Sequence, residues 1–127
     1  MSITFGRTVP VLRSFDESKA KEFYVEFLGF EITFEHRFGP DLPLYMGLER
    51  GGCQLHIPEH HGGVCPGSSL RIEVTEIDEF QQQLAAKQYR NARPGPPKDA
   101  PHGAREMSVT DPFGNNLCFF QEMAEGD

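Results

Sequence analysis

The stretch Ser69-Leu70-Arg71-Ile72-Glu73-Val74 decides the fold, because the order of elements that it opens repeats the order in the first half of the chain. Successive side chains of a strand point to opposite sides. The aliphatic residues of this stretch therefore share one face, while Ser69, Arg71 and Glu73 share the other. Two further stretches alternate in the same way: Cys53-Gln54-Leu55-His56-Ile57 and Asn116-Leu117-Cys118-Phe119. If these polar faces converge on one cavity, they form a binding site.

Each half of the chain reads as a strand, a helix and three more strands. In the first half, apolar residues at helical spacing follow a capping box formed by Ser14 and Glu17, and Gly29 is placed to end the helix. In the second half, Ile77, Phe80 and Leu84 mark a shorter helix. Alternation and turn residues predict strands at 8–12, 30–34, 44–48, 53–57, 70–74, around Tyr89, and at 106–109 and 117–120.

This order of elements recurs at an offset of about 61 residues, and few small folds repeat it. We therefore predict an α+β fold in which two tandem βαβββ modules, about 5–58 and 68–122, form a single domain over residues 1–127. The Gly-rich stretch 60–67 would link the modules.

The amino-acid composition excludes some classes of molecule that the chain could bind. The chain has 127 residues, with 12 Lys and Arg against 19 Asp and Glu, so its formal net charge is −7. That charge disfavours nucleic acid and anionic membranes as partners. We find no signal sequence and no apolar run of membrane-spanning length. Three cysteines without a Cys-x-x-Cys pair favour reduced thiols and a cytoplasmic location.

Six short motifs occur in order along the chain: Pro10-Val11-Leu12, Phe23-Tyr24, Leu28-Gly29-Phe30, Arg50-Gly51, Leu55-His56-Ile57 and Asp111-Pro112-Phe113-Gly114-Asn115. This ordered set resembles the glyoxalase, bleomycin-resistance and extradiol-dioxygenase superfamily, whose fold is called vicinal oxygen chelate. Within it the chain is most similar to the bleomycin-resistance, or bleomycin-binding, proteins. The resemblance implies curved mixed sheets that form a concave cleft, and a homodimer in which a partner subunit closes the cleft.

Metal-using members of this superfamily hold one ion at four strand positions. The resemblance and the internal repeat carry these positions to the neighbourhood of Arg7, His56, Ser69 and Cys118. Arginine cannot ligate and serine is a poor ligand. We therefore expect no metal and no cofactor. If a divalent metal such as zinc is bound after all, His56 and His60 are the candidate ligands.

The expected ligand-binding residues lie on the polar strand faces and in aromatic positions near them. His56 could instead bond to a neighbouring strand, Arg71 and Glu73 could pair with each other, and Cys118 could be a small apolar filler. Phe38 is the better candidate for an aromatic wall with Tyr45, whereas Phe34 favours the core. The predicted polar contacts are Gln54, His56, Ser69, Arg71 and Glu73, and the apolar ones are Phe38, Phe113 and Phe120.

The resemblance implies a small-molecule binding protein rather than an enzyme. Such a protein confers antibiotic resistance by sequestering a glycopeptide-like or other aromatic ligand without chemistry. An acidic protein with aromatic loop residues suits a cationic heteroaromatic ligand. Two alternatives stay open: a metal-dependent glyoxalase-like lyase or dioxygenase acting on a small metabolite, and a relative that binds an unrelated metabolite.

Overall fold

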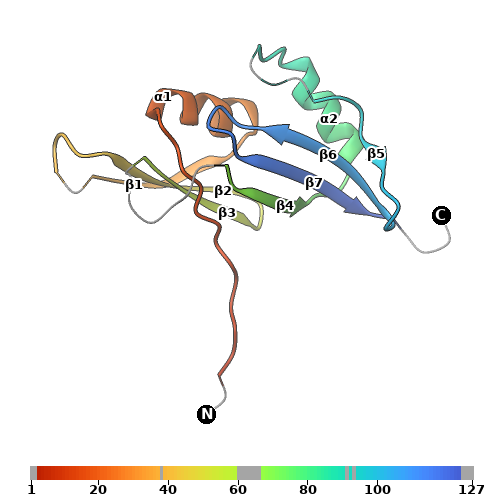
Figure 1. Ribbon diagram of the computed structural model, residues 1–127, viewed down its shortest axis with the longest axis horizontal. Coiled ribbons are helices and arrows are strands. Elements are labelled where there is room, and N and C mark those ends of the chain that lie inside the picture. Colours follow the sequence, from red (N-terminus) through yellow and green to blue (C-terminus); the bar gives the residue numbers. More distant parts are fainter. Residues whose placement is uncertain (1–2, 38, 60–66, 91, 93, 124–127) are drawn as a thin grey trace.

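The fold consists of two sheets of strands with helices on one side (Figure 1). The computed structural model describes residues 3–37, 39–59, 67–90, 92 and 94–123. Helix α1 (Glu17–Ala20) continues directly into the π-helix η1 (Lys21–Phe27), and α2 spans Ile77–Ala86. The strands are β1 (Glu31–Arg37), β2 (Leu44–Arg50), β3 (Cys53–Pro58), β4 (Ser69–Glu73), β5 (Lys98–Asp99), β6 (Ala104–Thr110) and β7 (Asn116–Glu122). The predicted α+β class is confirmed.

The two sheets repeat one topology. The first has the order β1-β2-β3, and the second has the order β4-β7-β6-β5. Strand β4 runs parallel to β7, while the other pairs are antiparallel. In the first half the chain before the helix takes the place of β4, because Val11 forms a parallel bridge with His56 on β3. The sheets are curved and unclosed, and their curvature agrees with what the resemblance implies.

The strand predicted at 8–12 is wrong, because this segment forms only an isolated bridge at Val11. The backbone N–H of His56 donates to Pro10 O and the N–H of Leu12 donates to His56 O, both at 2.9 Å, but these bonds form the isolated bridge and not a strand. Pro10 has no N–H, so it cannot extend a ladder by donating. The exposed segment before it runs away from the sheets (Figure 1).

The apolar stripe predicted for the first helix is buried. Its members Ala20, Phe23, Tyr24, Phe27 and Leu28 are at most 2% exposed. The predicted cap is wrong, because the side chain of Asp16, not that of Ser14, accepts from the helix N–H of Lys19. The N–H of Ser14 donates to Pro58 O at 3.0 Å instead, so the chain is still alongside β3 at this point.

The second half differs from the prediction around Tyr89. This residue belongs to no strand; its ring stacks on Phe27, with centroids 4.8 Å apart. Strand β6 pairs on its outer edge with the two-residue strand β5, which comes after Pro94, Pro96 and Pro97. Proline removes ladder donors, so the ladder begins only beyond this run.

A buried polar cluster joins the turn after β6 to the first module. Asp111 accepts from the hydroxyl of Tyr24 at 2.5 Å and from the backbone N–H groups of Phe113 and Asn115 at 2.9 and 2.8 Å. The side-chain amide of Asn115 donates both to Asp111 and to Arg13 O. Burial and the Asp111 carboxylate raise the pKa of Tyr24, so its hydroxyl stays a donor.

In the part of the chain that the structure describes, no helix is long and apolar enough to cross a bilayer.

Candidate functional site

The polar face of the first sheet carries an aromatic cluster of Phe34, Tyr45 and His56. The rings of Phe34 and Tyr45 are stacked with centroids 6.0 Å apart and an interplanar angle of 11°. His56 stands edge-on to both, and its Nδ1 lies 2.9 Å from the Tyr45 hydroxyl. Phe34 is 40% exposed. The face therefore offers an aromatic surface to which a planar ring can stack.

Gly47 determines how Phe34 lies. The two residues are partners across β1 and β2, and a Cβ built on Gly47 would come within 2.2 Å of Cε1 of Phe34. Any side chain at residue 47 would occupy the space that the ring now fills. We name Phe34, Tyr45 and His56, lying over Gly47, the aromatic platform. We had expected Phe34 to lie in the core. The pairing of β1 with β2 brings Gly47 opposite the ring instead, and knowledge of that register would have located Phe34 on the sheet face.

The polar face of the second sheet is centred on Arg71. Its guanidinium lies 2.8 Å from Glu106, 3.7 Å from Sγ of Cys118 and 4.5 Å from the centroid of Phe120. The possible pair of Arg71 with Glu73 is therefore corrected, because the partner is Glu106 from β6. Nε2 of His102 lies 2.8 Å from the same Glu106 carboxylate.

The charges on this face are mutually stabilising. The hydrogen bond from Arg71 is the largest cause that lowers the pKa of Glu106, and His102 lowers it further. Because the carboxylate is ionised, it holds the guanidinium over the ring of Phe120. Arg71 is 47% exposed in its side chain, so this flat cation remains accessible to a ligand.

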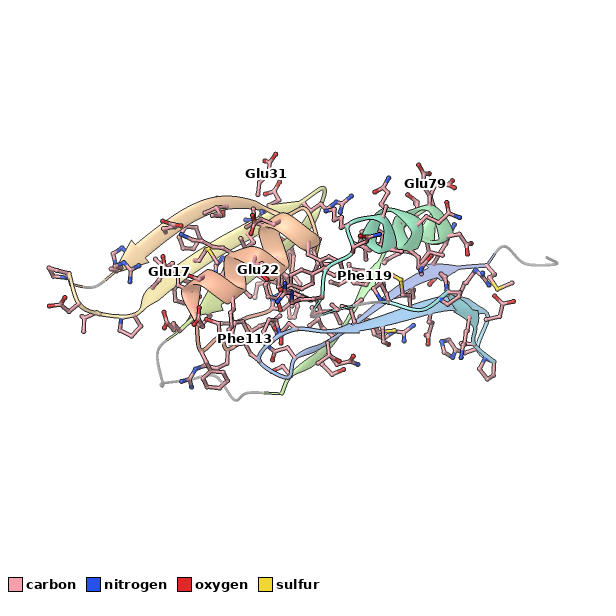
Figure 2. All side chains as sticks on the ribbon, turned by 90° about the horizontal axis from the view of Figure 1, so that it is seen from above. Glu17, Glu22, Glu31, Glu79, Phe113 and Phe119 are labelled. Carbon is pink, nitrogen blue, oxygen red and sulfur yellow. The ribbon has the colours of Figure 1, made fainter. Side chains whose placement is uncertain are left out.

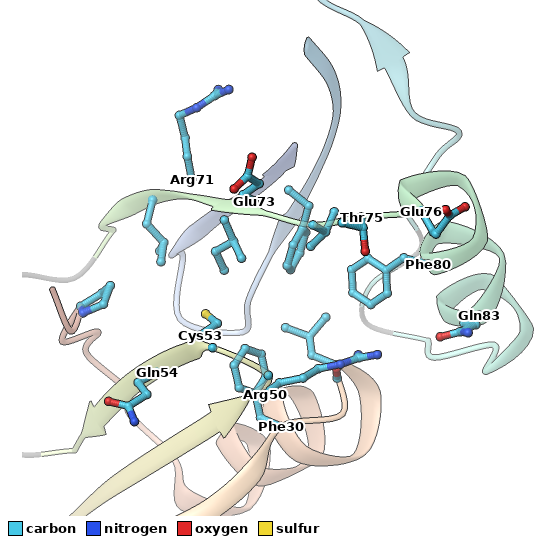
Figure 3. Close-up of a pocket in the computed structure, with 18 of the residues that line it drawn as sticks. Phe30, Arg50, Cys53, Gln54, Arg71, Glu73, Thr75, Glu76, Phe80 and Gln83 are labelled. Carbon is cyan, nitrogen blue, oxygen red and sulfur yellow. The ribbon is translucent and has the colours of Figure 1, made fainter. Parts of the chain in front are cut away.

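A pocket of about 780 Å³ separates the two modules. Its lining includes Leu70 and Ile72 of β4 and Val74 directly after it. Phe30 and Cys53 line it from the first module (Figure 3). Burial raises the pKa of the Cys53 thiol, which therefore stays protonated at neutral pH. We call this space the inter-module pocket.

The predicted site residues fall into separate places. Gln54, Arg71 and Glu73 border the inter-module pocket, but the Arg71 and Glu73 side chains project from the opposite side of β4 (Figure 3). His56 lies on the first polar face, where Gln54 bonds to Glu49. Ser69 and Phe120 lie on the second. Convergence of both faces on one cavity stays a prediction.

Two predicted apolar contacts need separate mention. Phe113 is 8% exposed and packs edge-on against Phe15, so the structure puts it in the core and we leave it out of the proposed site. Phe38 lies outside the described residues, as does His60. Glu106 is a polar contact that the sequence did not reveal, because it meets Arg71 only through the order of the strands β4, β7 and β6.

The four positions carried over from metal-using relatives do not fit a metal. Arg7 lies in the exposed N-terminal segment, and Nδ1 of His56 is engaged with Tyr45. The guanidinium of Arg71 contacts the sulfur of Cys118, so a cation bound there would meet a fixed positive charge. Among the described residues, no group of three or more His, Cys, Asp or Glu side chains could hold an ion.

Comparison with known proteins identifies the family. The model of a family described as glyoxalase superfamily protein matches residues 1–127. The chain belongs to the glyoxalase superfamily. A search of curated protein sequences found no match.

Several solved structures share the fold of this glyoxalase superfamily protein. A bleomycin-binding protein from bleomycin-producing Streptomyces verticillus, complexed with copper(II)-bleomycin, is 31% identical; the match covers 98% of this chain and 100% of that one, with a TM-score of 0.71. An antibiotic binding protein from Streptomyces sp. CB03234, TnmS3, is 25% identical with a TM-score of 0.75, and the match covers 96% and 98% of the two chains. A bleomycin-binding protein complexed with bleomycin is 26% identical over 93% and 99%, with a TM-score of 0.73.

Proposed function

We propose that this protein binds a small aromatic molecule of the bleomycin class and sequesters it without chemical change. The aromatic platform carries this proposal, because a partly exposed ring held flat on a sheet face is suited to stacking against a heteroaromatic group. The solved antibiotic complexes of similar chains support it.

The second polar face supplies the complementary contacts. Arg71 over Phe120 offers a planar cation, while Glu73 and Ser69 are exposed on the same strand. A ligand with both aromatic and cationic groups could stack on the platform and place its charge near the carboxylates. The formal charge of −7 would increase its encounter rate.

We further propose a homodimer in which the polar face of one subunit meets that of its partner. Each face is open in the single chain, and a half-open face buries too little of a drug-sized ligand for tight binding. Ile3 and Phe5 support this arrangement, because they are 90% and 99% exposed on the segment that leaves the body.

The test is calorimetric titration of the full chain with metal-free bleomycin and with copper(II)-bleomycin. We expect saturable binding of one ligand per chain, and mass spectrometry should recover the ligand unchanged. Arg71→Gln should weaken binding roughly tenfold, since it removes the planar guanidinium over Phe120 against which an aromatic group of the ligand would stack. Arg90→Gln, at an exposed arginine outside both polar faces, is the matched control.

Three results would overturn the proposal. Absence of saturable binding with either form of the drug removes the bleomycin class as ligand. Recovery of a modified ligand contradicts sequestration without chemistry. Stoichiometric zinc retained through purification without chelators would favour the metal-dependent lyase or dioxygenase instead.

A further inference from the structure

The inter-module pocket lies on the opposite side of β4 from the side chain of Arg71, and no residue of the aromatic platform lines it. Its walls come from the apolar side of β4, the start of α2 and the turn between β2 and β3. A volume of about 780 Å³ is within the range of small-molecule sites, roughly 300–1,000 Å³. The pocket can therefore be considered as a second site on the same chain.

Apolar side chains line much of this space, together with uncharged polar groups and the charged residues Arg50, Arg71, Glu73, Glu76 and Glu79. Phe30 and Phe80 lie on opposite walls, the sulfur of Cys53 points toward β4, and the hydroxyl of Thr75 is directed inward (Figure 3). Such a lining accommodates a hydrocarbon or aromatic body.

Arg50 supplies the charge at one wall. Its guanidinium donates to Leu28 O at 2.5 Å and lies 5.1 Å from the centroid of Phe80. A guanidinium has five N–H donors in a planar fork. Within the described ranges no carboxylate lies at ion-pair distance from Arg50, although acidic side chains outnumber basic ones in this chain by 19 to 12.

A second cation strengthens the positive potential beside Arg50. Nζ of Lys87 donates to Glu26 O and Phe27 O at the end of the first helix. Burial lowers the pKa of Lys87, and repulsion from Arg50 lowers it further. Lys87 does not line the pocket, but its charge adds to the positive potential at Arg50 and so favours an anion beside that residue.

The carboxylates that border the pocket are directed elsewhere. Figure 3 shows Glu73 projecting from the opposite side of β4, and Glu76 with its carboxylate turned away from Phe30 and Arg50. Figure 2 shows Glu79 projecting outward from α2. Arg71 also leaves the pocket and is neutralised by Glu106.

We infer that the inter-module pocket binds an organic carboxylate with an apolar body, whose carboxylate pairs with Arg50 and whose body lies between Phe30 and Phe80. Arginine suits this role because its free edge matches a carboxylate with two parallel hydrogen bonds. The inference goes beyond bleomycin binding and uses different side chains.

The first experiment measures charge selectivity with three fluorescent probes that share one ring system: pyrenebutyrate, neutral pyrenebutanol and cationic pyrenebutylamine. We expect the wild-type chain to bind the carboxylate about tenfold tighter than the alcohol, and the amine weakest. Arg50→Gln should remove the preference for the carboxylate and leave the affinity for the alcohol unchanged. Arg50→Lys should keep part of the preference, and Arg90→Gln should keep all of it.

The second experiment locates the probe and does not depend on a variant of Arg50. In a Cys65→Ser chain, iodoacetamide should alkylate Cys53 slowly, and saturating pyrenebutyrate should slow the reaction at least fivefold. Equal affinity for carboxylate and alcohol, strongest binding of the amine, or unprotected Cys53 would each overturn the inference. If the chain does not bind bleomycin but still prefers pyrenebutyrate to pyrenebutanol, the proposed function is contradicted and the inference about the inter-module pocket is not.

Discussion

Gly47 controls the aromatic platform at the scale of a single residue. Its missing side chain leaves the space in which Phe34 lies flat on the sheet, next to Tyr45. Phe34 is partly exposed and its ring can swing outward, so a methyl group at residue 47 would displace the ring rather than unfold the sheet. The consequence of substitution should therefore appear in binding more than in stability.

Gly47→Ala should weaken bleomycin binding at least tenfold, while the free energy of unfolding changes by about 1 kcal/mol or less. Calorimetry and urea denaturation measure the two quantities. The control is Gly52→Ala, because a Cβ at Gly52 would meet nothing within 4 Å. Unchanged affinity in Gly47→Ala would show that the platform does not contact the ligand.

Tyr24 gives a prediction on stability. Its buried hydroxyl donates to the Asp111 carboxylate, and hydrogen bonds to charged groups contribute about 1.5–3 kcal/mol. Tyr24→Phe should lower the free energy of unfolding by that amount in urea titration. Tyr45→Phe removes a hydroxyl that is only part-buried and should cost less than about 1 kcal/mol. Equal losses in the two variants would contradict this account.

Side-chain partners far apart in sequence were the least predictable part of the site. Alternation correctly separated Leu70 and Ile72 from Arg71 and Glu73, because a strand has a fixed period. It could not show that Arg71 pairs with Glu106, since the choice depends on which strands are neighbours in the sheet. The position of Phe34 over Gly47 could not be predicted for the same reason, because it depends on how β1 pairs with β2.

At the scale of elements, ion pairs attach β1 to the first helix. Glu17 lies at ion-pair distance from Arg37 and Lys21, and Lys21 also reaches Glu35 at 2.8 Å. The hydrogen bond from Arg37 is the largest cause that lowers the pKa of Glu17. A carboxyl whose pKa is lower in the folded than in the unfolded chain stabilises the fold above its unfolded pKa, about 4.3.

Glu17→Gln should therefore reduce the free energy of unfolding by about 0.5–1 kcal/mol at pH 7, since the group is part-exposed. The difference from wild type should shrink as the pH falls below about 5 and vanish once Glu17 is protonated in the folded chain. Urea titrations between pH 7 and pH 2.5 measure it. Glu22→Gln on the same helix, where no ion pair is formed by the described residues, should show little change at any pH.

Element type and order could be predicted better than element geometry. The apolar spacing from Ala20 to Leu28 identified the buried stripe, yet the structure winds Lys21–Phe27 as a π-helix. In that winding the N–H of Leu28 donates to Phe23 O, five residues back. The spacing of these five apolar residues places them on nearly one side of either an α-helix or a π-helix. The sequence therefore identified the buried side but could not distinguish the two windings.

At the scale of the whole molecule, the N-terminal segment is the feature most relevant to assembly. Residues 3–8 are all exposed, and Ile3 and Phe5 expose nearly all of their surface. Deleting residues 1–7 should leave the melting temperature of the isolated chain within about 2 °C, since residues 3–7 are exposed. It should also shift the oligomeric state from dimer toward monomer in sedimentation experiments.

A deletion variant that remains dimeric would show that the segment does not hold the partner. Ile3→Ser with Phe5→Ser is the milder version, and Ser2→Ala is its control. A wild-type chain that sediments as a monomer at the concentrations used for calorimetry would contradict the proposed dimer itself.

The bonds between Tyr24 and Asp111, and between Asn115 and Arg13 O, have a consequence for the history of the chain as well as for its folding. A repeated module could once have folded as an independent unit and assembled with a copy of itself. Here the Tyr24 hydroxyl and the Arg13 carbonyl of the first half bond to Asp111 and Asn115 of the second, so an isolated half would lose these two buried hydrogen bonds. We therefore expect the two halves to unfold together, and the chain should melt in one cooperative transition.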